Sequence, residues 1–75
     1  MKLYNNTQDQ VIYTISDNTS DNCGVIDMGQ TADEPSFDNT QGVTVAFSNN
    51  LGGQLNIFIP EPEPGMTVTV GIYFE

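Results

Sequence analysis

Apolar and polar residues alternate along most of this chain, which is the pattern of β-strands with one buried face. The longest alternation covers residues 66–74, with apolar residues at every even position. Three earlier segments repeat it and contain many β-branched and aromatic residues, as strands do. Their expected inward residues are Val11, Tyr13 and Ile15; Val43, Val45 and Phe47; Leu55, Ile57 and Ile59.

Shorter segments predict further strands. These are Lys2–Tyr4, Cys23–Met28 and a brief edge piece at Ser36–Asp38. The best helical candidate, Thr31–Glu34, is followed by Pro35 and so can form one turn at most. Pro64 and Gly65 are the residue types that a type II turn prefers at its two central positions.

Short strands separated by turn residues predict one all-β domain over residues 1–75. We expect a small antiparallel β-sandwich of the Ig-like or Greek-key type, with about six to seven short strands. Val43–Phe74 is interpreted as a three-stranded meander at the centre of the fold. In this interpretation Met66–Phe74 lies inside a sheet, Lys2–Tyr4 or Ser36–Asp38 forms an edge, and Val68, Val70 and Ile72 join the core.

The charge of the chain narrows the choice of partners. Ten acidic residues and a single cation, Lys2, give a net charge of −9 over 75 residues. Nucleic acids and anionic membranes attract Lys and Arg, so we expect neither as a partner. A basic protein surface is the favoured partner, and solubility alone is the simpler explanation. Mutual repulsion should also raise the average carboxyl pKa in the folded state, so that stability falls as the carboxylates ionise.

The residue types that most catalytic sites use are missing. The chain has no His, and its one basic side chain is Lys2, which excludes Ser-His and Cys-His catalysis and His-ligated zinc. Carboxylate pairs at residues 33–34 and 61–63 lie in loop patterns, where such groups are ordinarily solvated. We therefore expect no enzyme activity, no catalytic residue and no cofactor.

Acidic residues near position 17 suggest a calcium loop, but the pattern fails. An EF-hand loop begun at Asp17 requires Gly where Asn22 stands and Glu where Met28 stands. A polar turn whose side chains hydrogen-bond to the turn's own backbone is the better interpretation, and we expect no specific metal site.

Cysteine content and the first residues bear on the compartment. Cys23 is the single cysteine, so no internal disulfide forms, and we expect it to pack in or beside the core. Residues 1–6 contain no apolar segment like that of a signal peptide. A free thiol favours the cytoplasm, while an extracellular domain or export without an N-terminal signal stays open.

These observations predict a non-enzymatic acidic module that binds a protein with a basic surface. A structural or accessory domain that self-associates as a homodimer is one alternative, and a carbohydrate- or calcium-dependent binding module is another. Tyr13 should point inward and Tyr73 outward. The expected interaction surface comprises Asp17, Asp21, Asp33, Glu34, Asp38, Glu61, Glu63 and Tyr73.

Overall fold

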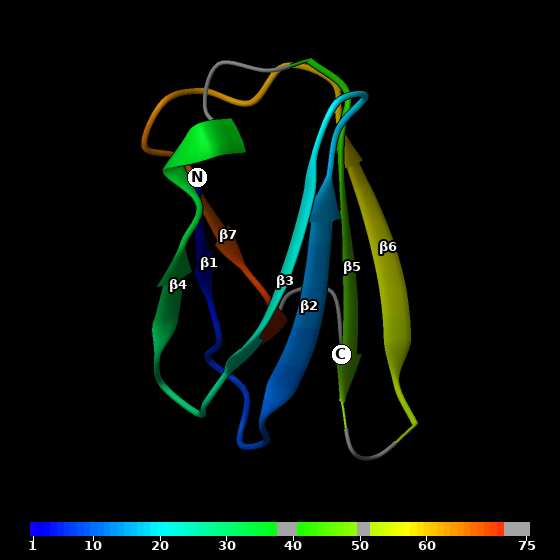
Figure 1. Ribbon diagram of the computed structural model, residues 1–75. Helices are drawn as coiled ribbons and strands as arrows, with labels where there is room; N and C mark the ends of the chain where they lie inside the picture. The colour runs from blue at the N-terminus through cyan, green and yellow to red at the C-terminus, as the bar shows by residue number, and fades with distance from the viewer. Residues whose placement is uncertain (38–40, 50–51, 72–75) are drawn as a thin grey trace.

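Two β-sheets pack face to face in the computed structural model of the chain, which describes residues 1–37, 41–49 and 52–71 (Figure 1). The sandwich predicted from the alternation is therefore confirmed. The described elements are β1 (Lys2–Tyr4), β2 (Val11–Ser16), β3 (Asp21–Ile26), β4 (Thr31–Asp33), a 3-10 turn η1 (Pro35–Phe37), β5 (Val43–Asn49), β6 (Gln54–Ile59) and β7 (Thr67–Thr69).

The larger sheet has four strands in the order β3-β2-β5-β6, and every neighbouring pair is antiparallel. The smaller sheet has three strands in the order β4-β1-β7. In it β1 pairs antiparallel with β4 and parallel with β7. The parallel pair brings together two segments from opposite ends of the chain.

Alternate residues of the strands fill the space between the sheets, as the sequence pattern predicts. From β2 and β5, the side chains of residues 11, 13, 15, 43, 45 and 47 are all buried. The smaller sheet contributes Leu3 and Val68, and the cluster also contains Val70, just after β7, with Met1, Ile26 and Phe37. The predicted inward faces of these strands are confirmed, while Ile72 and Phe74 lie outside the described residues.

The inward face of β6 is less buried than predicted. Leu55, Ile57 and Ile59 point to the interior side, but each is only half-buried. Their neighbours across the ladder on β5 are almost completely buried, with Val45 at 0% and Phe47 at 2% exposure. The cause is geometric: a sheet of four strands faces a sheet of three, so its last strand is incompletely covered.

The predicted meander over Val43–Phe74 is wrong. β5 and β6 form a hairpin, but β7 leaves them and pairs with β1 in the other sheet. The segment between β6 and β7 crosses one end of the sandwich (Figure 1) and ends in the predicted turn. There the Met66 N–H donates to the Glu63 carbonyl at 3.1 Å, and Gly65 has a φ of 77°. Alternation specifies which face of a strand is buried, but not which sheet the strand joins.

Strand positions also differ from the prediction in the smaller sheet. β1 lies in the middle instead of at an edge, and β7 is an edge strand instead of an interior one. Thr31–Asp33, part of the segment that could form one helical turn at most, is the strand β4, because β1 offers it a ladder partner. Pro35–Phe37 is a 3-10 turn in place of the expected edge strand, and Asp38 lies outside the described residues.

Candidate interaction surface

Several loops that are far apart in the sequence lie at the same end of the sandwich. The β2–β3 turn, η1 and the segment between β6 and β7 all lie at the top of Figure 1. Asp17, Thr19 and Gln41 line one shallow hollow, which joins the β2–β3 turn to the start of β5. The Gly42 N–H in turn donates to the Pro60 carbonyl at 2.9 Å, which joins β5 to the proline-rich segment.

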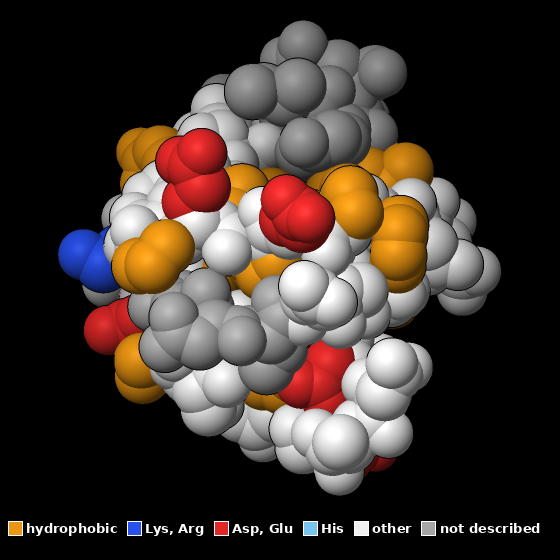
Figure 2. Space-filling view, turned by 90° about the horizontal axis from the view of Figure 1, so that it is seen from above, with side chains coloured by type: hydrophobic (Ala, Val, Ile, Leu, Met, Phe, Trp, Pro, Cys, Tyr) orange, Lys and Arg blue, Asp and Glu red, His pale blue; other side chains and the backbone are white. Residues whose placement is uncertain are grey.

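Four of the predicted surface residues lie in or directly beside these loops, and we call them the acidic end: Asp17, Asp21, Glu61 and Glu63. Asp21, Glu61 and Glu63 are exposed. Figure 2, which views this end from above, shows carboxylates spread among hydrophobic side chains, with the blue of lysine at the rim. The fold therefore brings together acids that are up to 46 positions apart, from residue 17 to residue 63.

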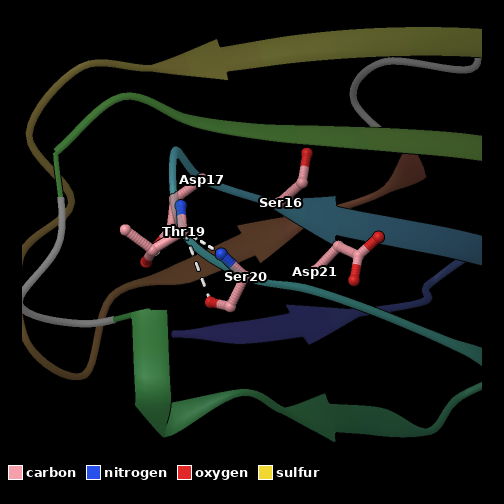
Figure 3. A pocket seen from close by; sticks show the side chains of 5 residues that line it. All are labelled: Ser16, Asp17, Thr19, Ser20 and Asp21. Atoms are coloured by element: carbon pink, nitrogen blue, oxygen red, sulfur yellow. Dashed lines mark hydrogen bonds between the residues drawn. The ribbon is translucent and has the colours of Figure 1, made fainter.

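The β2–β3 turn is held by the Asp17 side chain. Its Oδ1 accepts hydrogen bonds from the backbone N–H groups of Thr19 and Ser20, both at 2.8 Å. Asp17, Thr19 and Ser20, together with Ser16 and Asp21, line an open hollow of about 330 Å³. Figure 3 shows how these five side chains lie around it. The polar turn predicted for this loop, in which side chains hydrogen-bond to the loop's own backbone, is confirmed. The Asp17 carboxylate accepts its hydrogen bonds from the protein's own backbone.

Those two N–H donors lower the pKa of the Asp17 carboxyl, because they stabilise its ionised form. The direction is opposite to the rise that we expect for the average carboxyl group. A lowered folded pKa contributes stability above the unfolded pKa, and that contribution is lost as the pH falls through the folded value.

We expect Asp17→Ala to unfold at a lower denaturant concentration than the parent protein at pH 7, because the turn loses its acceptor. The difference should shrink as the pH falls through the lowered pKa of Asp17, because the parent carboxyl then also becomes protonated. Asp21→Ala, at the exposed start of β3, is the matched control for loss of one charge. Equal pH dependence in both variants would contradict the turn assignment.

Glu34 is buried, so its predicted place on the interaction surface is wrong. Only 6% of the residue is exposed. Its Oε1 accepts a hydrogen bond from the Tyr13 hydroxyl at 2.7 Å, and the Asn22 side-chain amide donates to both oxygens at 2.7 and 3.0 Å. Its backbone N–H donates to the Met1 carbonyl at 2.7 Å. The carboxylate therefore links the two sheets instead of facing a partner.

Tyr13 reaches this carboxylate because its cross-strand neighbour on β3 is Gly24. A Cβ at Gly24 would lie 2.9 Å from the tyrosine ring, so any other residue there would force the ring to shift. The inward direction predicted for Tyr13 is confirmed, and burial together with the Glu34 hydrogen bond raises the pKa of Tyr13 to about 12. Sequence analysis missed this group, since its members come from separate strands of the two sheets.

The remaining predicted surface residues divide into two groups. Asp33 is exposed on β4, and its ladder partner on β1 is Lys2. Asp38 and Tyr73 lie outside the described residues. Asp9 and Asp27, which were not predicted as surface residues of the site, belong to the loops at the opposite end of the sandwich (Figure 1).

Cys23 is exposed, so the prediction that it packs in or beside the core is wrong. It alternates with Gly24 and lies opposite Thr14 on the outer face of β3, an edge strand. Across residues 1–37, 41–49 and 52–71, no group of three or more acidic or cysteine side chains could hold a metal ion.

No family model, curated protein or solved structure matches the chain. Within the part of the chain that the structure describes, no helix has the length and hydrophobicity to cross a bilayer.

Proposed function

We propose that this protein is a non-enzymatic binding module whose acidic end binds a protein with a basic surface. The observation that carries the proposal is that two separate parts of the chain bring acids to one end of the sandwich: Asp17 and Asp21 at the β2–β3 turn, and Glu61 and Glu63 between β6 and β7. A carboxylate-rich end on a chain of net charge −9 attracts cationic surfaces and steers them during encounter.

The rigidity of the loops supports this proposal. Pro60, Pro62 and Pro64 restrict the backbone on both sides of the two glutamates, and Pro62 is itself buried. Asp17 is likewise fixed by its turn. Carboxylates held on rigid loops lose less conformational entropy on binding than carboxylates on flexible ones.

The exposed thiol of Cys23 suits a reducing compartment, since an unpaired surface cysteine oxidises readily outside the cell. Action in the cytoplasm is therefore part of the proposal. The partner is a protein whose binding surface carries several Lys or Arg side chains.

The test compares two variants that change the net charge equally at opposite ends. Glu61→Gln/Glu63→Gln removes two charges from the acidic end, and Asp9→Asn/Asp27→Asn removes two from the other. The partner is first captured from the native source at low salt, and its affinity for each purified variant is then measured by titration at ~0.05 M and ~0.3 M salt.

We expect the Glu61/Glu63 variant to bind the partner about tenfold more weakly at low salt, and the Asp9/Asp27 variant to bind it within about twofold of the parent. Affinity of the parent should fall steeply with salt. Equal losses in both variants would mean that net charge alone attracts the partner. No loss in either variant would remove the acidic end from the binding surface.

A further inference from the structure

The outer edge of β6 is unlike the other edges of the two sheets. Among the described residues, β5 is the sole strand that β6 pairs with, so within this part of the chain the second edge of β6 has no ladder partner. β6 has six residues, Gln54–Ile59, with no charge, no proline and no glycine. By contrast, the edge strand β3 begins with Asp21, β4 ends with Asp33, and β4 and β7 have three residues each.

The inner side of this edge is also incompletely covered. Leu55, Ile57 and Ile59 are half-buried, whereas Val43, Val45 and Phe47, their ladder partners on β5, are buried. On the outer side Phe58 is 63% exposed. A strand with free backbone groups and apolar side chains on both faces can extend a sheet if a matching uncharged strand is available.

We propose that β6 of a second copy of this chain pairs antiparallel with β6 of the first. The two four-stranded sheets then form one continuous eight-stranded sheet. β6 of the second copy is itself an uncharged strand of the same length. Two-fold pairing about Ile57 places Leu55 of each copy opposite Ile59 of the other. These apolar pairs cover the inner faces that the smaller sheet leaves half-exposed, and such pairs stabilise neighbouring strands.

The positions of the charged residues near β6 favour antiparallel pairing of the two copies over parallel pairing. Glu61 and Glu63 follow the C-terminal end of β6, while the residues before its N-terminal end, Gly52 and Gly53, carry no charge. Antiparallel pairing sets the glutamates of each copy beside the uncharged end of the other. The two glutamate pairs are then separated by at least the length of the strand, ~20 Å. That distance is twice the screening length of ~10 Å at 0.1 M salt, whereas a parallel pair would place the glutamates side by side.

The pairing area is small, so the dimer is weak. Edge pairing over six residues buries less than the ~1,200 Å² of a standard interface, and we expect a dissociation constant on the order of 0.1 mM. Because residual repulsion opposes pairing, association should strengthen from ~0.02 M to ~0.5 M salt. This direction is opposite to that expected for binding a basic partner.

Sedimentation equilibrium of the full chain under reducing conditions tests the proposal with two matched variants. Phe58→Glu and Val25→Glu each replace an exposed apolar side chain, 63% and 55% exposed, with one carboxylate on an edge strand of the same sheet. Circular dichroism of each variant checks that it is folded. We expect Phe58→Glu to weaken the dimer about tenfold or more and Val25→Glu to leave it within about twofold. A parent protein that is monomeric at ~1 mM in both salts, or equal weakening by both variants, would overturn the proposal.

A spin label tests the orientation. Gln54→Cys in a Cys23→Ser background carries the label at the exposed start of β6, and the two labels of an antiparallel dimer should lie about 20 Å apart or more. Labels within about 10 Å of each other would show a parallel pair and contradict the antiparallel arrangement.

Discussion

Replacing Phe47 with alanine should lower the free energy of unfolding by about 3–5 kcal/mol. Phe47 is 2% exposed, and its ring belongs to the cluster between the sheets. The loss combines the transfer free energy of the ring with the cost of the cavity that it leaves. A chain of 75 residues has a small stability margin, so much of the variant should be unfolded at 37 °C.

The matched control is Phe58→Ala, one strand away. Phe58 pairs with Thr44 on the outer face of the same sheet and is 63% exposed. Its replacement should change the unfolding free energy by about 1 kcal/mol or less. Urea denaturation followed by circular dichroism gives both values. Similar losses in the two variants would show that the inward and outward faces of the sheet have been assigned wrongly.

Raising the pH from 10 to 12 should remove about 2–3 kcal/mol of stability through Tyr13. Burial and the hydrogen bond to Glu34 raise the pKa of Tyr13 from 10.0 to about 12 in the folded protein. The unfolded chain therefore loses this proton first. The contribution is fully present below pH 10 and is lost as the pH rises through the folded pKa.

Tyr13→Phe isolates this effect. At pH 7 the variant should be less stable by about 1–3 kcal/mol, because the buried Glu34 carboxylate loses a hydrogen-bond donor. Between pH 10 and 12 it should lack the steep decline of the parent. Tyr4→Phe is the control, since Tyr4 is 36% exposed on the smaller sheet. If Tyr4→Phe removes the alkaline decline and Tyr13→Phe keeps it, the buried pair does not control the transition.

Alternation predicts which residues are buried but not how strands are paired. The inward sets of β2 and β5 follow from period-two patterning, and each is confirmed by burial. The same pattern cannot place β7, because Val68 would be buried in either sheet. Cys23 was predicted wrongly for a related reason: its side chain lies on the outer face of β3, opposite Thr14, and the short apolar segment around it does not specify which face is inward.

The candidate surface was predictable in composition and not in arrangement. Asp17, Glu61 and Glu63 lie in segments that are visibly loops in the sequence. Their presence at one end depends on the crossing of the chain from β6 to β7, which is a property of the whole fold. Glu34 has the same type of local sequence as the others, but its partners on β2 and β3 make it an interior residue.

The parallel pairing of β1 with β7 has a consequence for synthesis on the ribosome. β2, β3, β5 and β6 make up the whole larger sheet and are all complete once Ile59 has been made. β1, by contrast, pairs with Thr67–Thr69, and this partner is made 65 positions later, counted from Lys2 to Thr67. At about 5–20 residues per second, the ten residues from Ile59 to Thr69 take ~0.5–2 s. During that interval the inner face of the larger sheet lacks part of its cover, and a nascent chain is then most open to chaperones and to pairing with other chains.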